Sequence, residues 1–175
     1  SGKQEQQGKL DYTAGVVLGQ LPDRSSYFLL DAFKEKLPAN LIATAMVNMV
    51  ARWRDVAQQC KGEFKAAIED TAYTNFLPLT FESLMRERGI AGYCQLLRVI
   101  HSSKQGSKAD RIRAMAEPLS QARVFIPEKL IVLPTRSGME PYDVVAMFEN
   151  ELNKWPSVMD DDLLDAAAGA MEMTL

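Results

Sequence analysis

The chain has 175 residues, of which 47% are hydrophobic and 25% charged. This balance predicts one globular domain over residues 1–175 and excludes a disordered or fibrous protein. The formal net charge of −3 excludes a protein that coats nucleic acid by bulk electrostatics, so any DNA contact must use a local basic patch. No run approaches 18 apolar residues and no secretory signal is recognisable, which predicts a soluble, intracellular protein without a membrane partner.

Cysteine and histidine are too sparse for several common chemistries. Cys60 and Cys94 are the only cysteines and form no CxxC pair, so neither a zinc site nor a disulfide framework is supported. A Ser-His-Asp or Cys-His mechanism would depend on His101, the single histidine, and is disfavoured.

The first half of the chain predicts a β-hairpin followed by a long helix. Residues 13–20 are β-rich, residues 21–24 (LPDR) supply a turn, and residues 26–33 form a second β-rich run. From residue 41 to 60, apolar residues recur at spacings of three and four, which indicates a helix with one buried stripe. The stripe consists of Ile42, Met46, Met49, Trp53, Val56 and Cys60.

The remainder of the chain alternates between strands and helices. Strands are expected at 64–68, 92–100 and 123–126, and helices at 81–88, 108–119, 141–153 and 160–173. A hairpin followed by such alternation predicts an α/β fold in which helices cover both faces of a mixed sheet. RNase H-like architecture satisfies this order, and so do other three-layer folds.

The most informative segment is the acidic run at residues 160–165 (DDDLLD). On a helix, Asp162 and Asp165 are three residues apart and Asp161 and Asp165 four apart, so these carboxylates share one face. Their mutual repulsion is relieved by a bound cation. Capping of the helix N-terminus by acidic residues is the competing interpretation.

A second acidic position, Glu69-Asp70, ends the apolar strand at 64–68. The carboxyl ends of strands are where ligands lie in open α/β sheets, so a strand-end acid and a helix-start acid can meet there. Such an oxygen-rich cluster suits Mg²⁺ or Mn²⁺, although a solvent-facing acid pair remains the alternative. Lys104, Lys108, Arg111 and Arg113 form a basic cluster that either holds phosphate or lies on a solvated face.

Taken in order, these segments resemble the C-terminal nuclease domain of tailed-phage (or prophage) terminase large subunits, which belongs to the RNase H-like superfamily. The resemblance covers nearly the whole chain, and its specificity lies in the order of the pieces. One departure is Asp160, which stands where many members of the family carry a histidine. The matching pieces are residues 9–17 with 27–31, residues 67–70, 108–111, 123–127, 149–155, and the final DDxxDA-like run at 161–166.

The resemblance implies a metal-dependent endodeoxyribonuclease that cuts concatemeric DNA during packaging, by two-metal phosphodiester hydrolysis. It implies two Mg²⁺ or Mn²⁺ ions and assigns catalytic roles to Glu69, Asp162 and Asp165. It implies metal ligation by Glu69, Asp161, Asp162 and Asp165, and DNA binding by Lys104, Lys108 and Arg111. The implied partners are double-stranded DNA, an N-terminal ATPase domain of the same polypeptide, the portal and the small terminase subunit, in the host cytoplasm.

The family's first catalytic aspartate lies in a central strand that precedes the hairpin, and residues 1–12 show no such strand. The fragment is therefore expected to be weakly active or inactive without it. Two alternatives stay open: another RNase H-like nuclease of the resolvase or transposase type, and a non-catalytic fragment that binds DNA or procapsid and lacks the first metal ligand.

Overall fold

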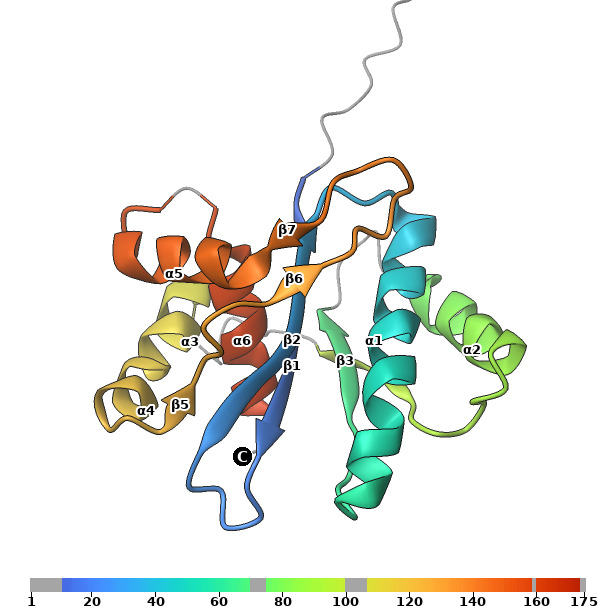
Figure 1. Cartoon of the computed structure of the whole chain (residues 1–175), viewed down its shortest axis with the longest axis horizontal. Helices are drawn as coiled ribbons and strands as arrows, with labels where there is room; N and C mark the ends of the chain where they lie inside the picture. Colours follow the sequence, from blue (N-terminus) through green and yellow to red (C-terminus); the bar gives the residue numbers. More distant parts are fainter. Residues whose placement is uncertain (1–10, 70–74, 100–106, 159, 174–175) are drawn as a thin grey trace, which may run out of the picture.

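A computed structural model describes residues 11–69, 75–99, 107–158 and 160–173. The chain is a mixed α/β protein whose helices surround small sheets (Figure 1). In chain order the elements are β1 (Thr13–Gln20), β2 (Tyr27–Glu35), α1 (Ala39–Gln59), β3 (Ala66–Glu69), α2 (Leu77–Glu87), β4 (Leu96–Val99), α3 (Lys108–Ala114), α4 (Ala116–Ser120), β5 (Val124–Phe125), β6 (Ile131–Val132), β7 (Tyr142–Asp143), α5 (Val144–Lys154) and α6 (Asp162–Glu172).

The expected hairpin forms the largest sheet. β1 pairs antiparallel with β2, with a bulge between Val17 and Leu18, and β5 adds to the other edge of β2 in parallel. Gly15 allows the close approach of Phe33, because a Cβ at this glycine would lie 2.4 Å from the Phe33 ring. Every residue of β1 is half-buried whereas most of β2 is buried, as expected for a strand at the edge of its sheet.

Buried residues of the described chain form a larger and a smaller hydrophobic core. Helix α1 contributes side chains to both cores, rather than burying a single stripe. Ala45 and Met49 pack into the larger core, and Val47 and Val50 pack into the smaller core with α2. The expected stripe is therefore wrong for most of its residues: only Met49 is buried, Ile42, Met46 and Trp53 are half-buried, and Val56 and Cys60 are exposed. The helix itself was predicted within two residues at each end.

The second sheet consists of β3 and β4, which run parallel, and β3 lies beside α1 in Figure 1. Both strands were predicted, but β4 begins at Leu96 rather than at residue 92, because residues 91–93 form a turn. The one mixed sheet that the sequence predicts is thus represented, within the described ranges, by separate small sheets. In that part of the chain no helix is long and apolar enough to cross a membrane.

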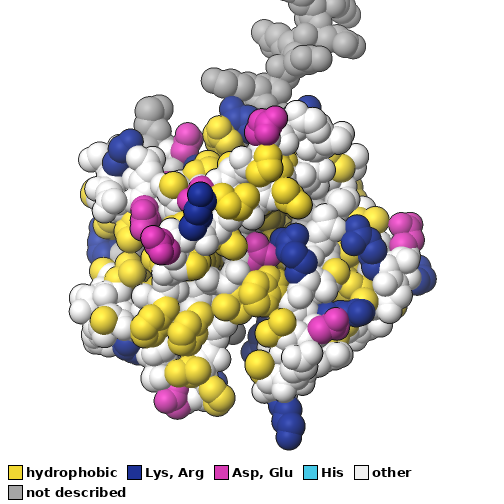
Figure 2. Space-filling model, in the orientation of Figure 1, with side chains coloured by type: hydrophobic (Ala, Val, Ile, Leu, Met, Phe, Trp, Pro, Cys, Tyr) yellow, Lys and Arg dark blue, Asp and Glu magenta, His cyan; other side chains and the backbone are white. Residues whose placement is uncertain are grey.

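The C-terminal half departs from prediction in two places. The helix expected over 108–119 is divided into α3 and α4, because Pro118 has no N–H for the bond that would continue α3. The short antiparallel pair β6–β7 was not predicted at all. Figure 2 shows hydrophobic side chains on the surface over β5 and β6, where Phe125 and Leu133 are 50% and 77% exposed.

Helix α6 was predicted closely and packs against β1. Its apolar side chains Leu163, Leu164, Ala167 and Met171 are all buried, as the amphipathic pattern indicates. Helix α5 packs against the same helix and against β2. The acidic start of α6 is therefore held over the hairpin by a rigid apolar face.

Candidate functional site

Three of the predicted acidic residues meet at one lysine. The Lys108 ammonium lies 2.7 Å from Asp161 Oδ1, 3.7 Å from Asp162 Oδ1 and 3.7 Å from Asp165 Oδ2. Lys108 is the first residue of α3, and Ser107 and Asp110 fix that helix start in a capping box. We call Asp161, Asp162 and Asp165 the α6 carboxylates.

Arg111, one turn further along α3, connects the α6 carboxylates to the end of β3. Its NH2 lies 2.7 Å from Asp165 Oδ1 and 3.9 Å from Glu69 Oε1. Asp165 and Glu69 are thus separated by no more than the sum of these two distances. That sum is below the separation of about 8 Å beyond which carboxylates could not share a two-metal cluster.

Glu69 and the α6 carboxylates therefore lie around two cationic side chains, those of Lys108 and Arg111. These acids were predicted from a strand end and a helix start. The direct separation of Glu69 and Asp162, on which the metal hypothesis also depends, stays a prediction. Glu69 lies within ion-pair distance of Arg111, and about half of its side chain is exposed to solvent. Neither of the two predicted roles, a member of an acidic cluster or a solvent-facing acid, therefore describes Glu69 alone. Asp70 and Lys104 lie outside the described residues.

The N-terminus of α6 is not capped by the side chain of Asp161, the residue of the acidic run at the N-cap position. Asp161 occupies the N-cap position, but its side chain makes no capping hydrogen bond. Glu151 of α5 does so instead, because its Oε2 accepts from the backbone N–H groups of Leu163 at 2.9 Å and Leu164 at 3.1 Å. The α6 carboxylates are thereby left to face Lys108 and Arg111.

The predicted basic cluster is divided between the interior and the surface. The Arg111 side chain is only 7% exposed, and both its Nε and NH2 donate to Asp165 Oδ1. Arg113 is exposed and pairs with Asp110 of its own helix. The Lys108 side chain is intermediate, at 41% exposed, and can reach solvent as well as the acids.

The electrostatics favour a charged Lys108. Burial is the largest single influence and lowers the pKa of its ammonium. The hydrogen bond to Asp161 and the charges of Asp165 and Asp162 together outweigh burial and raise that pKa above its ordinary value.

Two residues that the sequence did not single out complete the site. Lys34 of β2 and Glu151 of α5 are buried, at 6% and 2% exposed, and form an ion pair with Nζ and Oε1 2.6 Å apart. The one available signal was that Glu151 stands in helical register with the apolar residues Val144 and Phe148, on the buried face of α5. Burial raises the pKa of Glu151, against the lowering effects of Lys34 and of the two α6 N–H groups.

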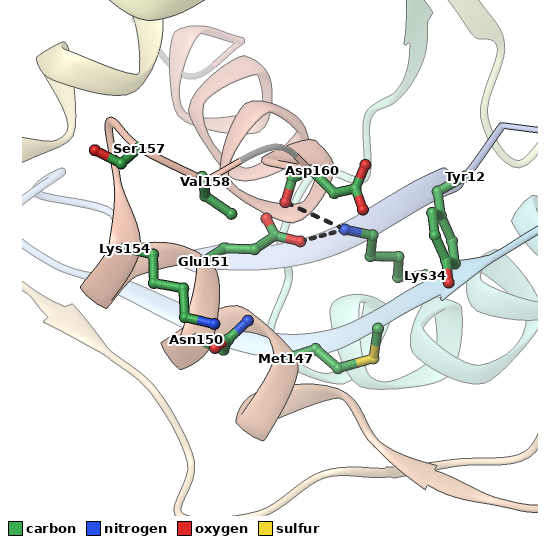
Figure 3. A pocket seen from close by; sticks show the side chains of 9 residues that line it. All are labelled: Tyr12, Lys34, Met147, Asn150, Glu151, Lys154, Ser157, Val158 and Asp160. Atoms are coloured by element: carbon green, nitrogen blue, oxygen red, sulfur yellow. Dashed lines mark hydrogen bonds and ion pairs between the residues drawn. The ribbon is translucent and has the colours of Figure 1, made fainter.

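A cavity of about 440 Å³ adjoins this ion pair. It is lined by side chains from β2, α5 and the linker to α6, among them Lys34, Glu151, Lys154 and Asp160, with the Tyr12 ring on its wall (Figure 3). In Figure 3 the Lys34 ammonium points toward Glu151 and the Asp160 backbone carbonyl rather than into open space. The Lys34 and Glu151 charges are therefore satisfied within the protein.

The donor set fits hard divalent cations, because the α6 carboxylates and Glu69 offer only oxygen atoms. Among the residues that the structure describes, however, no group of three or more His, Cys, Asp or Glu side chains is arranged to hold a metal ion. Lys108 and Arg111 lie between the acids and neutralise part of their charge. The oxygen donors are of the type that Mg²⁺ or Mn²⁺ prefers, but in this structure they are arranged around Lys108 and Arg111.

No protein-family model matches the sequence, and no curated protein or solved structure matches the chain. Evidence about function comes instead from the side chains at this site.

Proposed function

We propose that this chain is the nuclease domain of a phage or prophage DNA-packaging terminase large subunit, with an RNase H-like fold. The reaction is metal-dependent hydrolysis of DNA phosphodiester bonds. The observation that carries the proposal is the meeting of Glu69 and the α6 carboxylates around Lys108 and Arg111. A strand-end acid and a helix-start acid, Glu69 and Asp165, share the Arg111 guanidinium although they are 96 residues apart in the sequence.

The α6 carboxylates and Glu69 would hold two Mg²⁺ or Mn²⁺ ions, with Glu69, Asp162 and Asp165 as the residues closest to the chemistry. The chemistry that such ions supply is activation of a water and stabilisation of the leaving oxygen. The protein's own contribution is to hold the acids on a rigid helix start and strand end, within reach of one another.

Lys108 and Arg111 have two roles in this proposal. In the absence of divalent ions they neutralise the acids, which would otherwise repel one another. When cations occupy the carboxylates, the exposed Lys108 side chain becomes free to contact a DNA phosphate. Arg111 is buried and bonded to Asp165, so its larger contribution is to orient that carboxylate.

The first central strand of the resembling fold is part of the proposal. β1 pairs only with β2, and β3 only with β4, among the residues that the structure describes. The edge of β1 that does not face β2 has no strand partner within these described ranges, and the resembling fold would place its first strand, with the first aspartate, at such an edge. The predicted partners, namely double-stranded DNA, the ATPase domain, the portal and the small terminase subunit, rest on the resemblance alone, as does the host cytoplasm.

A cleavage assay tests the proposal. Supercoiled plasmid is incubated with the chain, and with a version extended upstream through the first strand, in Mn²⁺, Mg²⁺ or chelator. The extended protein should nick plasmid only with divalent ions, and the chain alone should be much weaker. Asp162→Asn and Glu69→Gln, which keep side-chain size but remove charge, should each abolish most of the cleavage.

Asp55→Asn is the matched control, because Asp55 is an exposed acid whose side chain pairs with its neighbour Arg54 on α1. This variant should cut DNA like the parent protein. Cleavage that persists in Asp162→Asn and Glu69→Gln, or that needs no divalent ion, would defeat the nuclease assignment. DNA binding without cleavage by the extended protein would favour the non-catalytic alternative, and cleavage confined to branched DNA would favour a resolvase-type enzyme.

A further inference from the structure

The buried pair Lys34–Glu151 lies directly behind the α6 carboxylates. Lys34 belongs to β2 and Glu151 to α5, so the pair connects two elements that both pack around α6. The side chains of Lys34 and Glu151 are 5% and 3% exposed, and water can scarcely reach them. Removing two charges from water carries a desolvation penalty that an apolar pair of similar size would avoid.

Each partner of this pair also contacts α6 or Asp160, which lies two residues before α6. Glu151 Oε2 accepts from the Leu163 and Leu164 N–H groups, which satisfies two of the four N–H groups that a helix start leaves without a partner. Lys34 Nζ donates to the Asp160 carbonyl at 3.4 Å and lies 3.5 Å from Asp162 Oδ2. The pair thus fixes the first turn of α6 from one side.

Lys108 and Arg111 contact the same first turn from α3, on the side where the carboxylates converge. Asp162 is shared, because its Oδ2 faces Lys34 and its Oδ1 faces Lys108. Asp162 therefore lies between two lysine ammonium groups, at 3.5 Å from Lys34 and 3.7 Å from Lys108. The position of Asp162 consequently depends on Lys34 as well as on its own helix.

We propose that Lys34 and Glu151 are positioning residues, which set the orientation of Asp162 and Asp165 by fixing the first turn of α6. This inference rests on the proposed metal-dependent nuclease function of the α6 carboxylates. Neither residue contacts DNA or a metal ion directly. Loss of the pair is expected to weaken divalent-ion binding about 10- to 100-fold, as is typical when the partners that orient metal ligands are removed.

The test is Mn²⁺ binding by calorimetry to the extended protein and to the double variant Lys34→Met/Glu151→Gln. The double variant leaves no buried charge without a partner and does not alter the net charge near the carboxylates. A pair that is only structural would therefore leave Mn²⁺ affinity unchanged. The positioning role predicts a dissociation constant at least about tenfold higher, together with faster hydrogen exchange at the Leu163 and Leu164 amides.

Asp31→Asn/Arg52→Met is the matched control, because it removes a different ion pair of β2, with 2.6 Å between Arg52 NH2 and Asp31 Oδ2. It should leave Mn²⁺ affinity unchanged. If Lys34→Met/Glu151→Gln does not fold, Lys34→Gln/Glu151→Gln keeps a polar group at both positions, also removes both charges, and should still weaken Mn²⁺ binding.

Different results would overturn the positioning role of Lys34 and Glu151 and the proposed nuclease function. Unchanged Mn²⁺ affinity in a folded pair variant would overturn the positioning role and leave the nuclease function standing. Absence of Mn²⁺ binding by the extended parent protein would overturn the nuclease function, and with it the positioning role. Equal weakening in the Asp31→Asn/Arg52→Met control would also overturn the positioning role, because the effect would then be general to β2.

Discussion

Replacement of Lys108 by Met should have opposite effects on stability and on metal affinity. The ammonium lies 2.7 to 3.7 Å from the three α6 carboxylates. One ion pair at about 4 Å is worth about 4 kcal/mol at an effective dielectric constant of about 20. Exposed pairs, however, contribute only about 0 to 1 kcal/mol, and the Lys108 side chain is 41% exposed. We expect Lys108→Met to lower the free energy of unfolding by about 1 to 2 kcal/mol.

The same substitution should tighten Mn²⁺ binding. Without the ammonium, the carboxylates keep more negative charge for a divalent ion, and a gain of about 1.4 kcal/mol corresponds to tenfold higher affinity. DNA cleavage should nevertheless decline, because the variant lacks the ammonium group that is proposed to contact a DNA phosphate. Saturating Mn²⁺ should also restore the lost stability, since a ligand at 100 times its dissociation constant stabilises by about 2.7 kcal/mol.

Urea denaturation at pH 7, with and without Mn²⁺, and calorimetric titration measure both effects. Lys65→Met is the control, because Lys65 is an exposed lysine that pairs with Glu63 at 3.6 Å, outside the site. The raised pKa of Lys108 adds a pH test: its stabilising effect is present below about pH 10.5 and is lost as the pH rises through the higher folded value. Unchanged stability together with unchanged or weaker Mn²⁺ binding in Lys108→Met would refute the competition between ammonium and metal.

Two further predictions concern the scaffold. Trp53→Ala should lower the free energy of unfolding in urea by about 2 to 4 kcal/mol, because the half-buried ring also donates Nε1–H to Asp31 Oδ2 at 2.9 Å, and a loss below about 1 kcal/mol would contradict this. Burial is the main cause that raises the pKa of Tyr142 to about 12, so its contribution to stability is complete below pH 10 and disappears as the pH rises toward 12. Tyr142→Phe should remove this alkaline decline, and a phenol absorbance titration in which every tyrosine ionises near pH 10 would exclude the shift.

The elements with strong apolar periodicity could be predicted from the sequence. The hairpin, α1, α5 and α6 were identified from local signals, namely β-rich runs around a turn for the hairpin and apolar residues at helical spacing for the helices. The pair β6–β7 could not be, because each strand has two residues and too little alternation to detect. It is held by contacts distant in sequence: Glu35 accepts from Thr135, and the Lys34 N–H donates to the Tyr142 hydroxyl at 3.0 Å.

Some residues of the candidate site could likewise be predicted from the sequence, and others could not. Glu69 and the α6 carboxylates were found from local signals, namely a strand end and an acidic helix start. Lys34 and Glu151 were not, because they are separated by 117 positions and no local pattern indicates that a lysine in a strand meets a glutamate in a helix. The capping role of Glu151 is equally invisible, since Asp161 occupies the expected N-cap position without making the bond.

The charges of the site account for how the acidic cluster can exist in the folded protein. Glu69 and the α6 carboxylates carry four negative charges and Lys108 and Arg111 two positive ones, while Lys34 and Glu151 cancel each other. The site therefore keeps a net charge of −2, which solvent and the positive end of the helix dipole at the start of α6 can stabilise. Binding of two divalent ions would reverse the sign of this balance to a net positive charge. A site with that sign attracts the phosphate backbone of DNA, so metal binding would also create the local basic surface that the acidic composition of the chain does not provide.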